Sequence, residues 1–400
     1  MHIMKFELTF PIGKLVFAGM LMSQILTPKA PAQTFSVIHN FTGGNDGGGP
    51  LSGFVSDGAG NLYGTTNSGG PTNHGLVYRL NKNGLETVMY NFKDGSDGAY
   101  PDGGLVRDKM GNLYGTTTGG GVSNAGTVFE VAGVGKERVL YSFTGAADGA
   151  DPEAALTMDA AGNLYGTTIE GGTNGNGTVF KLTRPKTGAK WTETVLYSFG
   201  TGTDGATPVA SVAFDKTGNL YGTTSAGGAY GYGTIFELMP SGSAWTETIL
   251  HDFQDGDDGA VPFAGLISDK AGNFYGAAGE GGTGGGGTVF ELTPASGGWT
   301  FAVLYSQAGW NVSGTFRNLL LDASGNLYGT THCDGAPEAG TVYELTPVNG
   351  AWSYTLLYTF TGGTDGLYSF SNLVFQQGKL YGTTNEGGTD DAGVVFEVTP

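Results

Sequence analysis

Short apolar runs alternate along the chain with turns rich in glycine, asparagine and aspartate. One stretch shows the full pattern: "PVASVAFD" (208–215), "LYGTT" (220–224), "TIFELM" (234–239) and "WTETILHDF" (245–253). Each run is rich in β-branched and aromatic residues and is bounded by turn-forming residues, as β-strands are. The pattern therefore predicts an all-β unit of four consecutive strands.

This four-strand unit occurs seven times. Each copy carries "GNLYGTT" (111–117) or a close variant of it, and the copies lie 51 to 56 residues apart, measured between their tyrosines. These tyrosines are Tyr63, Tyr114, Tyr165, Tyr221, Tyr275, Tyr328 and Tyr381. Kelch-type blades repeat about every 50 residues, and four strands make one blade of a propeller. The sequence therefore predicts a seven-bladed β-propeller.

The repeat region begins with a fourth strand and ends with a third strand, which predicts how the ring closes. "FSVIHNF" (35–41) resembles the fourth strand of other copies, such as "RVLYSF" (138–143). "GVVFEVTP" (393–400) corresponds to a third strand, so copy seven has no fourth strand of its own. We expect 35–41 to pair with 393–398, which would close the ring and remove two open sheet edges.

Within each copy, several positions suit the architecture of a blade. Gly111 can adopt a positive φ in the turn before the second strand, and Asp108 can accept hydrogen bonds from amides of that turn. Tyr114 is expected to pack between blades. Pairs of small residues begin most inner strands, where seven strands crowd around one axis: Gly103-Gly104, Ala154-Ala155, Ala210-Ser211 and Ala264-Gly265.

The first 32 residues have the features of a secretory signal peptide. Lys5 and Lys14 precede or flank the apolar run "LVFAGMLMSQIL" (15–26), and "APA" (30–32) offers small residues for cleavage near Gln33. We therefore divide the chain into a signal peptide (1–32) and a propeller (33–400). No later stretch is long enough to span a membrane. A monomer that is secreted, periplasmic or held at a bacterial cell surface is expected.

The charge and the cysteine content narrow the choice of partners. The formal net charge is −18, so nucleic acid is excluded as a partner because binding phosphates requires basic surface. Cys333 is the only cysteine, which rules out a disulfide within the chain.

Several motifs together resemble a known repeat family. "GNLYGTTTGG" (111–120), "GTVFELTP" (287–294) and "WTETVLYSF" (191–199) are similar to the GloVer tandem repeat of exported bacterial proteins, the choice-of-anchor GloVer-containing proteins. The double glycine after the second strand and four tryptophans also resemble kelch blades. These are Trp191, Trp245, Trp299 and Trp352. The resemblance implies export and a repeat fold, and it implies no defined activity.

One aspartate follows the fourth strand in six copies and would form a ring of carboxylates on one face. The six are Asp46, Asp97, Asp148, Asp204, Asp258 and Asp365. We interpret them as Asp-Gly turns that serve the architecture. Calcium is the disfavoured alternative, because "DGDDG" (255–259) lacks the spacing and final glutamate of an EF-hand. No metal site and no cofactor are expected.

The sixth copy breaks the repeat and carries the candidate binding site. "QAGWNVSGTFRN" (307–318) and "HCDG" (332–335) replace the expected loops. With the next blade they place aromatic and polar groups at the mouth of the channel: Trp310, Asn311, Arg317, Asn318, His332, Asp334, Tyr368 and Asn372. Tryptophan and tyrosine can stack on sugar rings, and arginine and asparagine offer directed hydrogen bonds. The alternative is that one exposed loop has drifted.

Three functions remain open at this point. The first is a binding or interaction scaffold whose loop-rich face holds a glycan or a cell-surface partner. The second is a carbohydrate-active hydrolase or lyase with a carboxylate and Arg317 at the channel mouth, and the third is a structural envelope protein. The segment 33–400 has only His39, His74, His251 and His332, and no nucleophile elbow or HExxH motif. These observations favour binding over catalysis, and no catalytic residue is assigned.

Overall fold

The computed structural model describes residues 33–188, 190–242, 244–308 and 319–400. They belong to one compact unit, Gln33–Pro400. Within these ranges the chain forms strands and one short 3-10 helix, η1 (Gly95–Asp97). None of the described segments forms a helix long and apolar enough to cross a bilayer. The predicted signal peptide, 1–32, lies outside the described residues.

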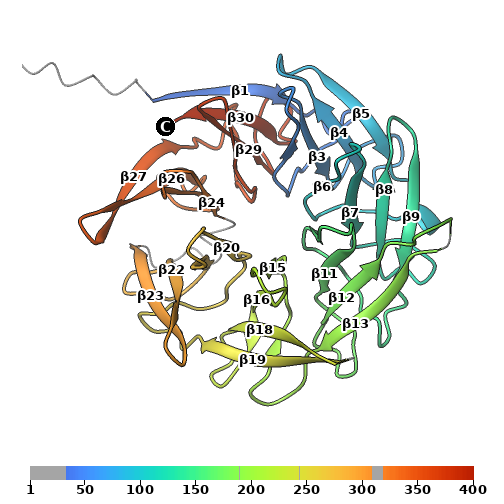
Figure 1. Ribbon diagram of the computed structural model, residues 1–400. Coiled ribbons are helices and arrows are strands. Elements are labelled where there is room, and N and C mark those ends of the chain that lie inside the picture. The colour runs from blue at the N-terminus through green and yellow to red at the C-terminus, as the bar shows by residue number, and fades with distance from the viewer. Residues whose placement is uncertain (1–32, 189, 243, 309–318) are drawn as a thin grey trace, which may run out of the picture. The chain divides into compact units, whose positions relative to one another are not determined.

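The strands form seven antiparallel four-stranded sheets arranged in a ring (Figure 1). Blade 1 comprises β2 (Val55–Ser56), β3 (Leu62–Thr66), β4 (Leu76–Leu80) and β5 (Glu86–Asn91). Blade 2 comprises β6 (Val106–Arg107), β7 (Leu113–Thr117), β8 (Thr127–Val131) and β9 (Glu137–Ser142). Blade 3 comprises β10 (Thr157–Met158), β11 (Leu164–Thr168), β12 (Thr178–Thr183) and β13 (Thr192–Ser198). Blade 4 comprises β15 (Ala213–Phe214), β16 (Leu220–Thr224), β18 (Thr234–Ser241) and β19 (Ala244–Asp252).

The remaining blades follow the same order. Blade 5 comprises β20 (Ile267–Ser268), β21 (Phe274–Ala278), β22 (Gly285–Ala295) and β23 (Gly298–Ala308). Blade 6 comprises β24 (Leu320–Leu321), β25 (Leu327–Thr331), β26 (Thr341–Val348) and β27 (Ala351–Thr359). Blade 7 comprises β28 (Val374–Gln376), β29 (Lys379–Thr384), β30 (Val394–Thr399) and β1 (Thr34–Asn40). A short extra pair joins β14 (Gly205–Ala206) to β17 (Ala226–Gly227). The seven-bladed propeller predicted from the repeat is confirmed.

The ring closes as the phase of the repeat predicts. β1 pairs antiparallel with β30, with Phe35 opposite Val398 and Asn40 opposite Val394. The amide of Phe41 extends the ladder by donating to the carbonyl of Gly393 at 3.1 Å. In Figure 1, β1 lies along the outer side of β30 beside the C-terminus. The predicted pairing of 35–41 with 393–398 is therefore confirmed.

The inner strand of each blade is shorter than its apolar run. In blade 4 the run 208–215 contributes only Ala213–Phe214 to the ladder. The residues at the start of the run bond instead to the preceding blade: the first of the two threonines in the second strand of that blade donates a hydrogen bond to one of their carbonyl oxygens. Thr167 Oγ1, for example, lies 3.1 Å from the carbonyl oxygen of Ala210. Small residues at this point let the blades approach the axis closely.

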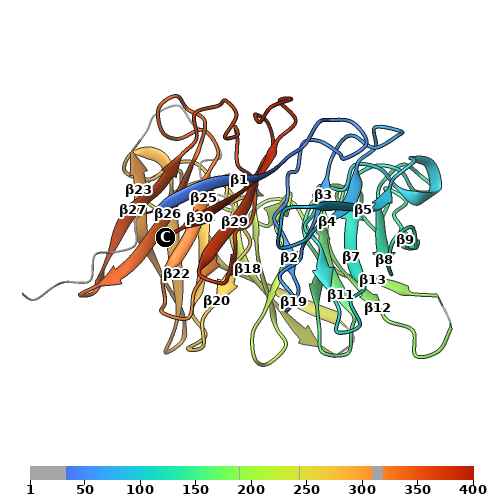
Figure 2. The same ribbon diagram turned by 90° about the horizontal axis from the view of Figure 1, so that it is seen from above.

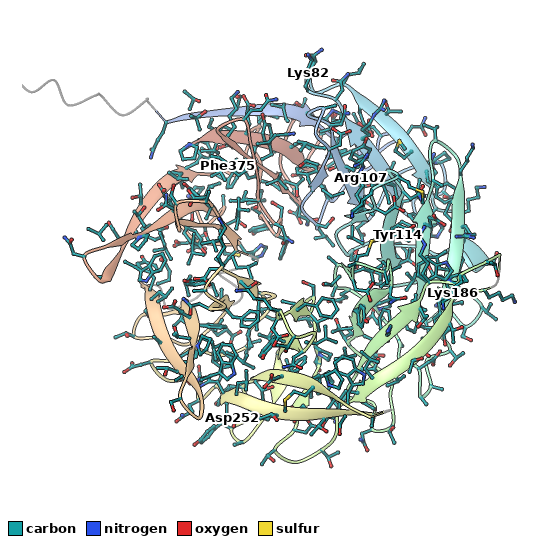
Figure 3. The ribbon with its side chains drawn as sticks, in the orientation of Figure 1. Lys82, Arg107, Tyr114, Lys186, Asp252 and Phe375 are labelled. Carbon is teal, nitrogen blue, oxygen red and sulfur yellow. The ribbon has the colours of Figure 1, made fainter. Side chains whose placement is uncertain are left out.

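The "GNLYGTT" motif builds the turn and the interface between blades. Asp108 Oδ1 accepts hydrogen bonds from the amides of Met110 and Asn112, both at 2.9 Å, and Gly111 has a φ of 93°. Tyr114 is 1% exposed and packs with Leu156 of the next blade, while its hydroxyl donates to Asp108 at 3.1 Å. Figure 3 shows Tyr114 within the wall of the ring. The architectural interpretation of this motif is confirmed.

Candidate functional site

The loops after the second and fourth strands meet on one face of the ring. Ala99 bridges Gly119 in blade 2, and Ala150 bridges Glu170 in blade 3. The turns between first and second strands lie on the opposite face, because the strands run from one face to the other (Figure 2). The glycine-rich loops and the Asp-Gly loops therefore share one face, which we call the loop-rich face.

The repeated aspartates close their own loops. Asp148 Oδ2 accepts hydrogen bonds from the hydroxyl of Tyr141 and the amide of Thr144, both at 2.9 Å. Burial alone would raise the pKa of Asp148, but the hydrogen bonds from Thr144 and Tyr141 outweigh burial and lower it. Asp365 makes the same two contacts in blade 6, with Tyr358 and Thr361. Because these bonds hold the loop after the fourth strand, a structural role accounts for the aspartate that recurs at this position.

The residues predicted from the broken copy fall into two places. Trp310, Asn311, Arg317 and Asn318 lie outside the described residues. The ring of His332 lies 4.5 Å from that of Tyr368 and 4.1 Å from that of Phe370, measured between centroids. These three rings form an aromatic cluster where blades 6 and 7 meet.

Asp334 and Asn372 lie apart from each other. Asp334 Oδ2 accepts a hydrogen bond from Gln307 Nε2 at 2.6 Å, in the outer part of the interface between blades 5 and 6. Burial raises the pKa of Tyr305, and the negative charge of Asp334 raises it further. Asn372 faces the axis instead and lines a central cavity. The structure thus groups Asn372 with Phe370 and places Asp334 away from them.

The central cavity lies on the axis of the propeller and has a volume of about 310 Å³. Blades 2 and 3 contribute the acidic residues Asp102 and Glu153. Blades 5 and 7 contribute the phenyl rings of Phe263 and Phe370, with Asn372 next to the latter. We call these five residues the axial site. The cavity is therefore acidic on one side and aromatic on another.

Four of these residues occupy one position of the repeat. Asp102, Glu153, Phe263 and Phe370 each stand directly before the pair that begins an inner strand. In most blades the pair is small because the strands crowd at the axis, so the residue before it is the first large side chain that reaches the central space. Asn372, the second member of the pair in blade 7, is an exception. Our sequence interpretation missed this position. The signal was present, because the position changes from blade to blade within an otherwise regular repeat.

Asp102 sits in an unusual electrostatic environment. Its carboxylate accepts hydrogen bonds from Asn67 Nδ2 and, at 3.5 Å, from Thr118 Oγ1. Burial raises its pKa to about 6, and the negative charge of Asp151 adds to this effect. A carboxyl group with this pKa exchanges its proton close to neutral pH and can either donate or accept a hydrogen bond.

Other places could also hold a ligand. A second cavity, of about 330 Å³, lies between blades 4 and 5 on the face opposite the loop-rich one. Its lining includes Tyr221, Asp269 and Trp299, which are all positions of the repeat, so the architecture accounts for it. Among the described residues, the only group of three or more histidine, cysteine, aspartate and glutamate side chains near enough to share a metal ion is His39, Asp46 and Glu86.

The fold and the repeat place the chain in a known family. The family model of the Gloeobacter/Verrucomicrobia repeat matches residues 25–216, 139–319 and 210–400. The chain belongs to this family of repeat proteins, as the GloVer resemblance predicts. Among curated proteins, none is similar enough in sequence to count as a match.

Several solved structures share the fold at low sequence identity. A Bacteroides uniformis protein described as a candidate 6-phosphogluconolactonase has a TM-score of 0.53 at 16% identity, covering 80% of this chain and 88% of that one. The extracellular domain of a candidate hybrid two component system from B. thetaiotaomicron has a TM-score of 0.57 at 13% identity, covering 91% of this chain and 39% of the other. A Dyadobacter fermentans protein has a TM-score of 0.50 at 11% identity, covering 92% and 99%. At these identities the likeness shows the fold alone.

Proposed function

We propose that this protein is an exported binding module that holds a glycan at its axial site. The observation that carries the proposal is the composition of the central cavity, where Asp102 and Glu153 on one side complement Phe263 and Phe370 on another. The cavity volume, about 310 Å³, is at the lower end of the range for small-molecule pockets. One or two sugar units are the appropriate size for such a cavity.

The chemistry of the axial site suits a neutral, hydroxyl-rich ligand. Carboxylates accept hydrogen bonds from hydroxyl groups, and the amide of Asn372 can both donate and accept. Phenyl rings pack against the apolar C–H face of a sugar, as aromatic rings pack against other apolar surfaces. The aromatic cluster of His332, Tyr368 and Phe370 would extend this contact toward blade 6, on the side of the sequence-predicted site.

The comparison with solved structures supports only the scaffold of this proposal. Propellers hold ligands, catalyse reactions and assemble complexes on the same framework, so function must be argued from the site. One relative in fold is described as a candidate 6-phosphogluconolactonase and another as an extracellular domain. A sugar-related ligand and an extracellular location are hypotheses for this chain, and they rest on the axial site and on the predicted signal peptide.

A glycan-array screen of the protein tests the proposal. We expect selective binding to a small set of glycans, and Phe370→Ala should weaken it by about tenfold or more, which corresponds to roughly 1.4 kcal/mol. Tyr230→Ala is the matched control, because Tyr230 is 56% exposed on a loop of the same face and lies outside the cavity. Equal binding by wild type and Phe370→Ala would contradict the assignment.

A carbohydrate-active hydrolase or lyase is the second candidate. It is favoured by one observation: two carboxyl groups line the cavity, and the pKa of Asp102 is raised to about 6, as in a general acid. If this candidate is right, glycans that bind should be cleaved on prolonged incubation. Asp102→Asn should then abolish cleavage and leave binding largely intact. Unchanged glycans, analysed by mass spectrometry, would leave binding as the function.

A further inference from the structure

The outer edge of the ring has one interface unlike the others. Each blade ends in a strand that carries a tyrosine or histidine, and the fourth strand of the next blade places a side chain against it. At the interface between blades 7 and 1 the two residues are His39 of β1 and Glu86 of β5, with Nε2 and Oε2 3.9 Å apart. Asp46, in the loop that follows β1, completes a group whose ligand atoms all lie within 4.8 Å of one another.

Two atoms of this group are buried without a hydrogen-bond partner. These are Nε2 of His39 and Oε1 of Glu86, and their side chains are only 16% and 12% exposed. Buried polar atoms are normally paired, and leaving one unpaired costs about 1–3 kcal/mol. Both carboxylate oxygens of Asp46 accept hydrogen bonds from Thr42, Oδ2 from its amide at 3.0 Å and Oδ1 from its hydroxyl, so the carboxylate is fixed in place. Each oxygen has a second lone pair for a further partner.

The equivalent positions at two other blade interfaces carry different sets of residues. Between blades 4 and 5, His251 Nε2 is bonded to Asp258 at 2.9 Å, and Phe301 stacks on its ring at 3.8 Å where a glutamate would stand. Between blades 1 and 2 the glutamate is present as Glu137, but Tyr90 replaces the histidine and donates to its aspartate at 2.7 Å. Among the described interfaces, only that of blades 7 and 1 combines histidine, aspartate and glutamate.

We propose that His39, Asp46 and Glu86 bind a Zn²⁺ ion. One imidazole nitrogen and two carboxylate oxygens are a ligand set that zinc accepts, with water in the remaining position. Calcium prefers six to eight oxygen ligands, so the imidazole selects against it.

The position of the site gives the ion a structural consequence. His39 belongs to the strand that closes blade 7, and Glu86 belongs to the outer strand of blade 1. A bound ion would join the N-terminal closing strand to the first blade at the point where the ring is closed by pairing of distant segments. Zinc would therefore stabilise the closed ring, because a ligand that binds only the folded state raises its stability.

Zinc titration of the EDTA-treated protein tests the proposal by calorimetry and thermal unfolding. All samples carry Cys333→Ser, which removes a competing thiol. We expect one Zn²⁺ per chain and a higher melting temperature with zinc, and no such shift with calcium. His39→Tyr and Glu86→Phe install the residues found at other interfaces. Each should weaken binding by more than about tenfold, the lower limit for losing even a supporting partner of a metal ligand.

The matched control is His251→Tyr, which makes the same change at an interface without the glutamate and should bind zinc as the wild type does. Co²⁺ provides a readout that depends on no variant, because visible absorption bands should appear when it enters a protein site of mixed nitrogen and oxygen ligands. Absence of zinc binding by the protein that carries Cys333→Ser alone, or equal binding by His39→Tyr and His251→Tyr, would overturn the proposal.

Discussion

The outer rim and the axis of the propeller differ in how far the seven copies of the repeat agree. At the rim, a tyrosine or histidine bonds to an aspartate seven residues later, at 2.7 to 3.0 Å, in five of the seven blades. At the axis, the residue before each inner strand differs among blades and includes aspartate, glutamate and phenylalanine. The repeated residues therefore build the wall of the ring, and departures from the repeat shape the cavity at its centre.

The largest effect should follow from opening the ring. Deleting residues 33–42 removes β1, exposes the edge of β30 and takes away Phe35, whose ring stacks on Tyr358 at 3.7 Å. We expect the truncated chain to lose most of its stability, measured by thermal unfolding with circular dichroism. A chain that begins at Gln33 is the control. Equal melting of the two chains would show that the pairing of the ends contributes little.

The repeated tyrosine tests the wall of the ring more locally. Tyr114→Ala should lower the free energy of unfolding by about 3–5 kcal/mol, the range for removing a large buried aromatic side chain. Tyr114→Phe keeps the ring and loses only the hydrogen bonds to Asp108 and Glu130, so it should cost about 1 kcal/mol. Chemical denaturation measures both. Any affinity of the folded fraction for a ligand should be unchanged. A selective loss of affinity would contradict the assignment of Tyr114 to structure rather than to binding.

Carboxyl groups at the rim predict an unusual dependence of stability on pH. Burial, followed by the charges of Asp97, Asp148 and Asp204, raises the pKa values of Glu137, Glu193 and Glu247 to about 7. A raised acid pKa means that the folded state holds protons that the unfolded state releases. This contribution is fully present below the unfolded pKa of 4.5 and is lost as the pH rises through about 7.

We therefore expect the melting temperature to fall between pH 5 and pH 8. Glu193→Gln, which is neutral at every pH, should reduce that fall, and Glu170→Gln, at an exposed site, should not. A melting temperature that rises over this range would contradict the raised pKa values. As the pH falls from about 4 to about 2, stability should decrease as well, because the pKa of turn aspartates such as Asp57 is lowered from 3.8 to about 2 in the folded protein, so the unfolded chain binds their protons first.

The smallest effect on stability should come from the axis. Phe370→Ala and Asp102→Asn change side chains that line a cavity rather than fill a core, so their melting temperatures should stay within a few degrees of the wild type, as expected for a change of less than about 1 kcal/mol in a large domain. Differential scanning calorimetry measures this directly. A loss of stability comparable to that of Tyr114→Ala would show that the axial residues belong to the wall.

The fold could be predicted almost completely from the sequence, because the same pattern of strands and turns occurs in seven copies. The strand order, the closure by 35–41 and the turn around Asp108 could all be derived from local patterns that recur. The short inner strands could not be predicted, because carbonyl groups before them accept hydrogen bonds from the preceding blade rather than within the sheet. This hydrogen bond between blades depends on the distance between neighbouring blades at the axis. That distance cannot be read from the sequence of a single copy.

The candidate site was predicted only in part. Looking for departures from the repeat led to Tyr368 and Asn372, and the structure adds Phe370 between them. Asp102 and Glu153 were missed because each is an ordinary residue in its own loop, and only the convergence of seven inner strands brings them together. Trp310 and Arg317, outside the described residues, stay a prediction: Trp310→Ala should weaken a bound ligand by about 1–3 kcal/mol.

A crystal structure of the protein with a glycan selected on the array tests the central claim most directly. The account predicts a sugar ring in the axial cavity, packed against Phe370 or Phe263 and hydrogen-bonded to Asp102 or Glu153. A glycan bound at the outer rim, or in the cavity between blades 4 and 5, would contradict the claim that departures from the repeat at the axis form the binding site.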